Sequence, residues 1–411
     1  MRILLVSEDI PYPQMGGLAK HVLRLARALV DDGHQVDLLG GKKYSMEIIG
    51  EEGNFGGRFF GELDGHETQW KEGKLGMYVP MRRTWSARRF AKVILRHAGN
   101  YDVVHYHGHI PNVACYLPAH INFVQTRHDQ GSDCLADIRF RNGEICTEKD
   151  PVHCASCKTP RPNVVQKTVS VMAVNRYRSE VARGFQRHKT IFVSEMLRKN
   201  FGRTMGYDSN WGTVIHNFVN TDSIEKAISQ AKAPTDPTRI RVFMAGKLYR
   251  AKGVEAFLRE ISGKLPPHME ILIAGDGPDG ERLRKEFASD KIEFMGWCSP
   301  EKTLETAAAS SVVVMPSLCE EAFGYATLEG LLLGKPTFAL AHGATPELTV
   351  YSSYPDQLRL HPDMTSLVSD LITFTPSAST PPPPNNLASV EYAVKKILNV
   401  YTMPADQAVQ A

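Results

Sequence analysis

The sequence contains no long hydrophobic run. Its first apolar stretch, Ile3–Val6, is far too short for the core of a secretory signal and is typical of a buried strand. Nowhere do about 18 consecutive apolar residues occur, the length that a membrane-spanning helix needs. We therefore expect a cytoplasmic protein without a transmembrane segment, and leave open a peripheral contact with the inner face of the membrane.

An excess of charge of one sign is also missing. The formal net charge is +3 over 411 residues, which does not favour a nucleic-acid partner, and we predict none. The seven cysteines are an odd number in a chain with no visible leader, which argues against a disulfide framework. No G-x-G-x-x-G motif follows the first expected strand, which argues against a dinucleotide-binding protein. No Asp-x-Asp pair is placed to hold a divalent cation.

Short apolar runs alternate with helical patterns in both halves of the chain, which is long enough for two domains. A strand at 2–6, a Gly- and Pro-rich loop at 11–18 and a helix at 19–32 open the first half. After a break at 229–238 the pattern restarts with a strand at 241–245. The other expected strands are 35–39, 103–106, 122–126, 190–194, 269–274, 292–294, 312–315 and 337–340, and the other expected helices are 254–261, 280–287 and 389–401. Such alternation predicts parallel sheets with helices on both faces.

The domain prediction follows from these patterns. We predict an N-terminal domain of residues 1–222 that carries a Cys-rich insertion at 129–160, and a C-terminal domain of residues 236–372. The segment 373–386 contains four consecutive prolines and can form neither helix nor central strand. The fold class is therefore α/β with two doubly wound domains.

The segment from Met315 to Pro336, MPSLCEEAFGYATLEGLLLGKP, carries the strongest chemical signal. A strand ends at Met315 and a helix begins near Gly324, so a ligand can bind at the strand's carboxyl end beside a helix N-terminus that attracts anions. Glu321 lies in the loop and Glu329 about one turn inside the helix, so that one carboxylate can face a sugar and the other a ribose diol. The alternative is a first-turn acid and a solvated side chain, and the motif alone leaves the two readings balanced.

The chain resembles the retaining family 4 glycosyltransferases of GT-B fold over roughly residues 1–350. The resemblance is carried by Glu321-x7-Glu329 with Phe323-Gly324 inside it, followed by Gly334-Lys335-Pro336. The other matching motifs, in order, are Gly16-Gly17, Asp102–His105, Thr126-x-His128-Asp129, Gly246-Lys247, Lys252-Gly253, Ala274–Pro278, Phe294-Met295-Gly296, Gly343 and Pro346-Glu347-Leu348. Each motif is weak singly, and their order and spacing together are specific.

The resemblance implies two Rossmann-like domains facing a cleft, with residues 387–411 returning to the acceptor-side N-terminal domain. It implies transfer of a sugar with retention from a nucleotide-diphosphate donor to an acceptor hydroxyl, giving an α-linkage in surface glycan or glycoconjugate synthesis. Catalysis needs no metal; UDP- and GDP-sugars are the first candidate donors, and the acceptor is a sugar, a lipid-linked group or a small molecule. The alternatives are a nucleotide-sugar epimerase or a glycosyl phosphorylase on the same fold, or a zinc-containing binding module.

The same resemblance implies roles for single residues in the donor domain. Glu321 contacts the sugar hydroxyls, Glu329 binds the ribose, and Lys247 and Lys252 neutralise the diphosphate. Backbone near Trp297 and Cys298 meets the base. Further donor contacts come from the segment Phe323, Gly324, Tyr325, Ala326 and Thr327. Cations are needed because the departing nucleotide gains negative charge. The family pattern has Arg where this chain has Lys247, and lysine lacks the bidentate guanidinium fork.

In the N-terminal domain the expected site follows the first strand and a later one. Gly16 and Gly17 let the backbone approach a ligand closely, although a plain strand-to-helix turn would also use them. The resemblance places His128 beside the sugar and the reacting centre; a lone histidine is otherwise more often structural. His107 and His109 also follow a strand, with weaker support.

Four cysteines crowd into the predicted insertion: Cys134, Cys146, Cys154 and Cys157. The Cys154-x2-Cys157 pair is a good chelating half, and four thiolates could complete a tetrahedral structural zinc site that shapes the acceptor region. Reduced structural thiols or a redox-sensitive pair are equally compatible with the spacing.

A basic segment lies at 81–97, with six Lys or Arg residues and no acid. On a helix, Arg88, Lys92 and Arg96 share one face with Trp85. This face could dock on anionic lipid or on an anionic acceptor, or be an ordinary solvated face.

Overall fold

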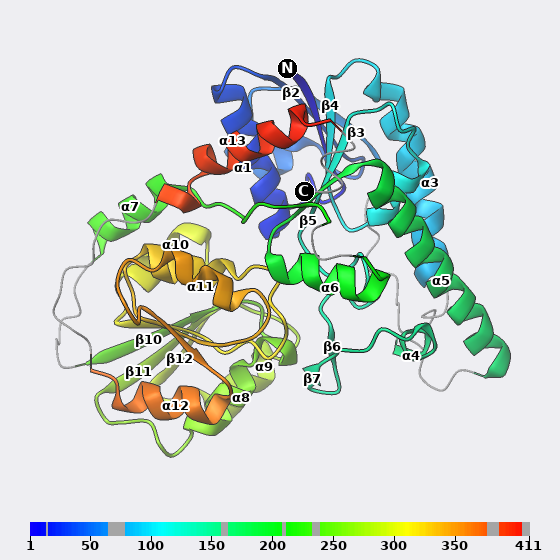
Figure 1. Cartoon of the computed structure of the whole chain (residues 1–411). Coiled ribbons are helices and arrows are strands. Elements are labelled where there is room, and N and C mark those ends of the chain that lie inside the picture. The colour runs from blue at the N-terminus through cyan, green and yellow to red at the C-terminus, as the bar shows by residue number, and fades with distance from the viewer. Residues whose placement is uncertain are drawn as a thin grey trace. The chain divides into compact units, whose positions relative to one another are not determined.

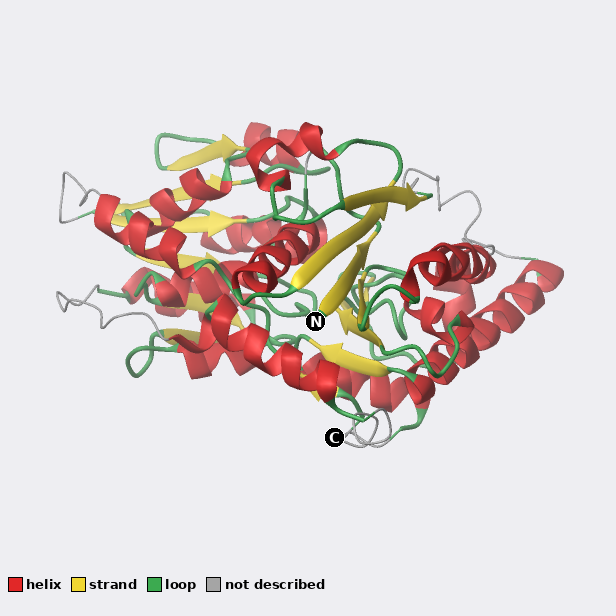
Figure 2. Cartoon of the chain, turned by 90° about the horizontal axis from the view of Figure 1, so that it is seen from above, coloured by secondary structure: helices red, strands yellow, loops and turns green. Residues whose placement is uncertain are grey.

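The computed structural model describes residues 1–13, 15–64, 79–157, 163–207, 211–231, 239–375 and 386–404, with only the backbone given for 79–82. The chain divides into two compact units. Unit 1 is Met1–Arg139, Cys146–Phe218 and Val390–Ala411, and unit 2 is Phe140–Ile145 and Val219–Ser389. Each unit is built on one parallel sheet, with helices on both of its faces (Figures 1 and 2).

The sheet of unit 1 has the order β3-β2-β1-β4-β5-β8-β9, and all its pairings are parallel. Its strands are β1 (Arg2–Ser7), β2 (Gln35–Gly41), β3 (Phe59–Leu63), β4 (Val103–His107), β5 (Phe123–Arg127), β8 (Lys189–Phe192) and β9 (Thr213–Val214). The run Ile3–Val6 is fully buried in the centre of this sheet, because helices exclude water from both faces.

The helices of unit 1 are α1 (Gly17–Asp31), η1 (Met46–Gly53), α3 (Val79–Ala98), η3 (Pro111–Tyr116), α4 (Pro151–Cys157), α5 (Val164–Arg187), α6 (Glu195–Met205) and α13 (Val390–Thr402). Helices α1 and α13 share one core, in which Val22 and Leu25 join Ala393 and Ile397. Helix α3 and η3 contribute to a second core, around Phe90. Within the described ranges, none of the helices combines the length and hydrophobicity that a bilayer-spanning segment needs.

The sheet of unit 2 has the order β12-β11-β10-β13-β14-β15 and is also parallel throughout. Its strands are β10 (Ile240–Ala245), β11 (Met269–Ala274), β12 (Ile292–Gly296), β13 (Val312–Met315), β14 (Thr337–Leu340) and β15 (Leu358–His361). Its helices are α7 (Thr221–Gln230), η4 (Arg250–Lys252), α8 (Val254–Ile261), α9 (Gly280–Phe287), α10 (Pro300–Ala308), α11 (Tyr325–Leu332), η5 (Thr345–Tyr351), α12 (Met364–Thr373) and η6 (Asn386–Ala388). A two-stranded antiparallel hairpin, β6 (Phe140–Arg141) and β7 (Glu144–Ile145), groups with this unit.

Most predicted elements are present, and the deviations have local causes. The predicted strand 190–194 ends two residues early, because Ser194 instead caps α6 by accepting a hydrogen bond from the N–H of Leu197 at 3.3 Å. The predicted helix 19–32 begins at Gly17, with Gly16 at its N-cap. Helix α5 was not predicted, although its buried residues Ala173, Tyr177, Val181 and Phe185 recur every four positions. Of the proline-rich segment, 376–385 lies outside the described residues.

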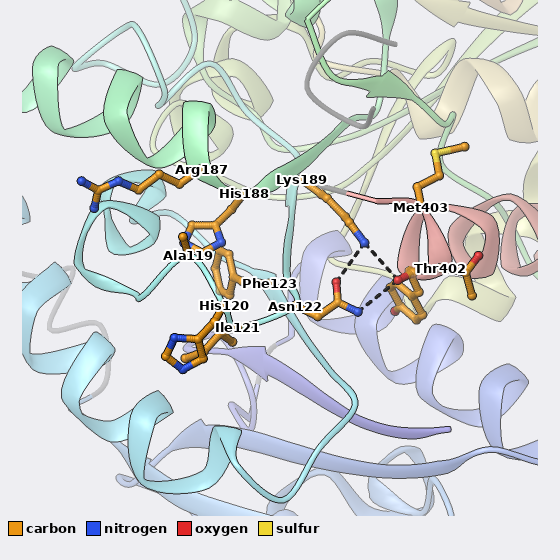
Figure 3. A pocket seen from close by; sticks show the side chains of 11 residues that line it. Ala119, His120, Ile121, Asn122, Phe123, Arg187, His188, Lys189, Thr402 and Met403 are labelled. Carbon is orange, nitrogen blue, oxygen red and sulfur yellow. Dashed lines mark hydrogen bonds between the residues drawn. The ribbon is translucent and has the colours of Figure 1, made fainter. Parts of the chain in front are cut away.

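The C-terminal helix α13 is fastened to the sheet of unit 1. The Tyr401 hydroxyl and Nδ1 of His105, on β4, are hydrogen-bonded at 2.7 Å. Nζ of Lys189 donates to the backbone carbonyl of Tyr401 at 3.0 Å and to Oδ1 of Asn122 at 2.9 Å (Figure 3). Lysine near a helix C-terminus satisfies carbonyls that the helix leaves unpaired and offsets their partial negative charge.

Candidate functional site

The carboxyl edge of the unit 2 sheet collects most of the residues that the sequence singled out. Because all its strands run parallel, their carboxyl ends meet at one edge, and ligands bind where the strand order reverses. That reversal lies between β10 and β13. Lys247 follows β10, Trp297 follows β12 and Glu321 follows β13.

Glycines with positive φ let the backbone segments at this edge approach one another. Gly253 has φ of 72°, and a Cβ there would collide with the carbonyl oxygen of Pro316. Gly343 has φ of 62°, and a Cβ there would press on the backbone of Glu320 and Glu321. Both conformations favour glycine, so the loop after β13 is held between neighbours that have no side chain.

The central contact of the edge is an ion pair between Lys252 and Glu321. Nζ of Lys252 lies 2.6 Å from Oε1 of Glu321, and Oγ of Ser317 donates to the same oxygen at 2.5 Å. The two charged side chains are 24% and 14% exposed, so water screens the pair only partly. Burial lowers the pKa of Lys252, but the neighbouring Glu321 carboxylate outweighs it and leaves that pKa raised. Lys252 is therefore a firmly charged cation.

Helix α11 begins directly beside this pair in the chain. Gly324 is its N-cap in the left-handed conformation, with φ of 97°, and the N–H of Leu328 donates to the Gly324 carbonyl at 3.1 Å. The N–H groups of 325–327, the first turn, are those that a helix terminus offers to an anion. The rings of Phe323 and Tyr325 pack edge to face, with their centroids 5.6 Å apart.

The other predicted donor residues lie at the same edge with different exposure. Lys247 is exposed, and Trp297 is 71% exposed. Sγ of Cys298 lies 3.7 Å from the carbonyl oxygen of Gly296. Glu329 and Ala326 on α11 are half-buried, whereas Thr327 is buried. In the described parts of the chain, no hydrogen bond or ion pair joins Lys247, Trp297 or Cys298 to the Lys252–Glu321 pair.

The carboxyl edge of the unit 1 sheet has a different composition. Its order reverses between β1 and β4, and the loops after β1, β4 and β5 meet there. Oε1 of Glu8, which is fully buried, accepts hydrogen bonds from the Tyr106 hydroxyl at 3.0 Å and from the His109 N–H at 2.7 Å. Glu8 therefore ties the first loop to the loop after β4.

Two carboxylates hold His109 between them. Nε2 of His109 lies 3.0 Å from Oδ2 of Asp9, and its Nδ1 lies 2.6 Å from Oδ2 of Asp129. Burial lowers the pKa of His109, but the two carboxylates outweigh it and leave that pKa well above the usual value. The guanidinium of Arg127, which is fully buried, reaches Oδ1 of Asp129 at 3.1 Å. The arrangement alternates negative and positive charge across the loops.

His21, His107 and His128 form a second group at this edge, which we call the histidine triad. Nδ1 of His107 lies 3.1 Å from Nε2 of His128, and the rings of His21 and His128 are 4.7 Å apart between centroids. Burial lowers the pKa of His107 to about 3, and burial with the neighbouring imidazoles lowers the pKa of His21 and His128. All three rings are therefore neutral near pH 7.

The histidine triad and its surroundings were only partly found from the sequence. His128 was predicted, and His107 and His109 were singled out with weaker support. His21, Glu8 and Asp9 were missed. A signal existed for the first of these, because His21 lies four residues before Leu25 on the buried stripe of α1. The predicted Gly16 is exposed, with open space where a Cβ would stand.

The four clustered cysteines form no disulfide and lie in unit 1. Cys154 and Cys157 share α4, and Sγ of Cys154 accepts a hydrogen bond from Nη2 of Arg178 at 3.3 Å. Burial raises the pKa of Cys134 to about 11. In the described residues, no three of these thiols have their sulfur atoms within 4.8 Å of one another. The structural zinc site stays a prediction.

A cavity of about 260 Å³ in unit 1 lies at the opposite edge of the sheet. It is lined by the residues that begin β5 and β8 and by the last residues of α13 (Figure 3). Its basic side chains already face carbonyls: Lys189 binds that of Tyr401, and Nε2 of His188 lies 3.3 Å from that of Leu117. Because α5 and α13 both end here, their negative ends disfavour an anionic ligand, and we do not assign the active site to this cavity.

Comparison with known proteins finds glycosyltransferase families in both halves of the chain. Residues 15–223 match the family model of Glycosyltransferase Family 4, and residues 239–366 match that of Glycosyl transferases group 1. The phosphatidylinositol N-acetylglucosaminyltransferase gpi3 subunit of Schizosaccharomyces pombe is 21% identical, over 89% of this chain and 72% of its own length. A phosphatidyl-myo-inositol mannosyltransferase of Propionibacterium freudenreichii is 21% identical, over 82% of this chain and 77% of its own length.

Solved structures agree on the fold. Anabaena HepE in complex with UDP-glucose superposes with a TM-score of 0.55 at 17% identity, covering 99% of this chain and 98% of that one. The two parallel-sheet units thus correspond to the GT-B architecture. Together with the two family models, which account for most of the sequence, this shows that the chain belongs to glycosyltransferase family 4.

Proposed function

We propose that the chain transfers a sugar with retention from a nucleotide-diphosphate donor to an acceptor hydroxyl, giving an α-linkage in a surface glycan or another glycoconjugate. The observation that carries the proposal is the Lys252–Glu321 pair at the point where the strand order of unit 2 reverses, next to the start of α11. Such an edge combines a fixed cation, a carboxylate and helix N–H donors, which are the groups that a sugar diphosphate needs.

In this proposal the ion pair exchanges partners when the donor binds. Glu321 accepts hydrogen bonds from sugar hydroxyls, and Lys252 turns from Glu321 to the diphosphate. Glu329, one turn inside α11, grips the ribose diol. Lys252 and Glu321 lie 2.6 Å apart, so both groups are available at the same place. A diphosphate oxygen that replaces Glu321 as the partner of Lys252 leaves the Glu321 carboxylate ready to accept a hydrogen bond from a sugar hydroxyl.

The reaction breaks the bond between the anomeric carbon and the diphosphate oxygen and forms a bond from that carbon to the acceptor oxygen on the same face. The acceptor proton passes to a donor phosphate oxygen. Negative charge grows on the departing nucleotide, and Lys252, Lys247 and the N–H groups of the first turn of α11 stabilise it. Catalysis therefore needs no metal ion in this proposal, and a chelator should leave the rate unchanged.

On the acceptor side, His128 is the proposed contact for the sugar near the reacting carbon. Its neutral imidazole can donate one hydrogen bond and accept another, and His107 already takes part in one of them at 3.1 Å. The relatives named above act on phosphatidylinositol lipids, and the solved relative binds UDP-glucose. We therefore propose a UDP-sugar as the first donor and a GDP-sugar as the second, with a sugar, lipid-linked or small-molecule acceptor.

A peripheral membrane contact through α3 is a secondary proposal. Trp85 is 62% exposed and Leu95 is 41% exposed on this helix, and Lys92 is exposed between them. Some of the positive charge is already used, because Nη2 of Arg96 lies 2.8 Å from Oε2 of Glu62. Sedimentation with liposomes with and without anionic lipid tests this contact; indifference to lipid charge would remove it.

A structural zinc ion held by Cys134, Cys146, Cys154 and Cys157 is proposed on the sequence spacing alone. The thiols would have to approach one another on binding. Elemental analysis of the purified chain that finds no stoichiometric zinc would remove this proposal.

The donor is tested first by thermal shift with UDP-, GDP-, ADP- and TDP-sugars. A ligand that binds only the folded state at 100 times its Kd raises the free energy of unfolding by about 2.7 kcal/mol. Products then separate the alternatives: a transferase releases free nucleotide diphosphate only when an acceptor is present. An epimerase would interconvert the donor sugar without an acceptor, and a phosphorylase would require inorganic phosphate. If no nucleotide sugar stabilises the chain, the proposal is wrong.

A further inference from the structure

The histidine triad places three neutral ring nitrogens around one point. One nitrogen each from His21, His107 and His128 lies within 4.8 Å of the other two. In the portion of the chain that the structure describes, this is the only group of three or more His, Cys, Asp or Glu side chains so arranged. Each comes from a different element, α1, β4 and the loop after β5, so the fold itself builds the group.

We propose that the histidine triad binds one divalent transition-metal ion of the zinc and cobalt class. Imidazole nitrogen is a preferred ligand of Zn²⁺, Co²⁺, Ni²⁺ and Cu²⁺, and three histidines with an open fourth position are a known zinc arrangement. Tetrahedral zinc with Zn–N bonds of about 2.0–2.1 Å keeps its nitrogens about 3.3 Å apart. Nδ1 of His107 and Nε2 of His128 are 3.1 Å apart, close to this separation, and one ring nitrogen from each of the three histidines lies within 4.8 Å of the other two, so small side-chain rotations could bring the three nitrogens onto one ion.

His107 has a nitrogen with no other use. Its Nε2 is buried and has no hydrogen-bond partner among the described residues, while its Nδ1 faces His128. A buried donor or acceptor without a partner costs about 1–3 kcal/mol. Binding an ion through Nδ1 replaces a single weak imidazole–imidazole hydrogen bond. Ligation by His107 therefore gives up little hydrogen bonding.

The surroundings limit the affinity of the site. The triad contains no carboxylate, and the charge of the nearby Arg127 guanidinium acts against positive charge on His107. Ligand histidines usually donate their second N–H to a carboxylate or carbonyl, and losing such a partner costs about 10- to 100-fold in affinity. We expect micromolar rather than nanomolar binding, with water or an anion in the fourth position.

Cobalt titration of the untagged, chelator-treated wild-type protein tests the proposal. Co²⁺ in a low-symmetry imidazole site absorbs in the visible region, whereas Co²⁺ on thiolates adds a strong near-ultraviolet charge-transfer band. Alkylating the cysteines removes the second contribution. The expected result is a visible spectrum, at one ion per chain, that survives alkylation.

Two variants and a matched control locate the ion. His107→Asn should weaken the alkylation-resistant Co²⁺ binding by about tenfold or more, because one of three ligands is lost. His105→Asn is the control: it is equally buried, lies two residues earlier on β4 and is not in the group, so binding should change less than about threefold. His21→Phe is the second variant, because its ring can keep the packing on Phe218, whose centroid lies 4.2 Å from that of His21.

The outcomes are separable from the transferase proposal. Wild-type protein with no alkylation-resistant cobalt spectrum, or equal binding in both triad variants and the control, would overturn the metal site. If a triad variant does not fold, X-ray absorption on cobalt-loaded wild-type protein decides between nitrogen and sulfur ligands. A chain that binds cobalt at the triad but transfers no sugar keeps this inference and loses the proposed function. If both hold, zinc should inhibit transfer, since the ion occupies His128.

Discussion

The carboxyl edges of the two sheets differ in which residues form them. At the carboxyl edge of unit 2 the loops contain glycines with positive φ, namely Gly246, Gly275, Gly296, Gly324 and Gly343. They leave room for backbone segments to approach one another around the Lys252–Glu321 pair, whose side chains are mostly buried. At the carboxyl edge of unit 1, the described residues directly after β1, β4 and β5 include no such glycine, and buried imidazoles and carboxylates fill the space.

This difference separates two kinds of chemistry. Bare backbone and exposed cations suit a ligand that carries its own charge, because the ligand supplies the missing counter-charge. Buried, neutral imidazoles suit uncharged hydroxyls, since burial penalises any ionised group that lacks a partner. In the proposed reaction, we therefore expect the donor diphosphate to bind at the edge of unit 2 and hydroxyl groups to be recognised at the edge of unit 1. The predictions below test this division, from the largest expected effect to the smallest.

Removing the carboxylate charge from the unit 2 edge should have the largest effect. Glu321→Gln keeps the side-chain shape but weakens the hydrogen bonds to sugar hydroxyls and breaks the pair with Lys252. We expect kcat to fall about 100- to 1,000-fold, the range seen when a single charge-stabilising group is lost. Transfer from the donor identified by thermal shift measures it, with Glu320→Gln as the control in the same loop. Equal losses in both variants would mean that Glu321 has no special role.

Removing the cation should come next. Lys252→Met keeps the aliphatic stem but leaves the half-buried Glu321 carboxylate without its partner. Since charge-assisted hydrogen bonds are roughly twice as strong as neutral ones, nucleoside diphosphate should bind about 10- to 100-fold more weakly. Calorimetric titration with UDP and GDP checks this. Lys252→Arg should recover part of the affinity; a charge-restoring variant as weak as Lys252→Met would argue for a purely steric role.

The backbone contact of the unit 2 edge can be tested without touching a charge. Gly253→Ala would force its Cβ against the Pro316 carbonyl, whereas Gly263→Ala, at nearly the same φ, meets nothing within 4 Å. Both variants pay the strain of a left-handed alanine, about 1–2 kcal/mol. Only Gly253→Ala adds a collision, so its free energy of unfolding should fall by about 2 kcal/mol more. Urea denaturation of both variants measures the difference; equal losses would mean that the loops separate freely.

Acid should weaken the unit 1 edge before the unit 2 edge. Burial lowers the pKa of His107 to about 3, while an unfolded histidine titrates near 6.5. Below pH 6.5 the unfolded chain binds a proton that the folded chain does not, so stability is lost as the pH falls from 6.5 toward 3. At pH 5 the loss is about 2 kcal/mol for this one residue, whereas the raised pKa of His109 adds stability as the pH falls and offsets part of the loss.

Hydrogen exchange in the presence of a chelator measures the protection of backbone amides in each unit separately. After correction for intrinsic rates, peptides from β4 and β5 should lose protection between pH 7 and pH 5, and those from β10 and β13 should keep theirs. Equal loss in both units would mean that the buried, neutral histidines of unit 1 do not determine which unit acid weakens first.

The sequence was more informative about the site of unit 2 than about that of unit 1, because the two edges are built from residues at different separations along the chain. In unit 2 the ends of strands and the Gly-Lys or Glu-rich loops that follow them are adjacent in the sequence. The local pattern could therefore place Glu321, the start of α11 and the strands 269–274 and 312–315. The unit 1 site joins residues about 20 to 100 positions apart, such as His21 with His107 and Asp9 with His109. No local pattern encodes such pairs. Helix α5 was missed although its sequence carries both a buried stripe and a start signal, the capping box formed by Asn163 and Gln166.

The smallest effect concerns Lys247, the exposed cation where the family pattern has arginine. Exposed charges contribute about 0–1 kcal/mol, so Lys247→Ala should weaken nucleoside diphosphate binding by no more than about fivefold, well below the loss in Lys252→Met. Lys247→Arg supplies two parallel donors to a phosphate and should tighten binding about two- to threefold. Titrations at low and high salt check both, because screening should erase the Lys247 effects and leave much of the Lys252 effect. If Lys247→Ala proved as damaging as Lys252→Met, the cation that matters at this edge would be the exposed one, and the role assigned to the buried pair would pass to Lys247.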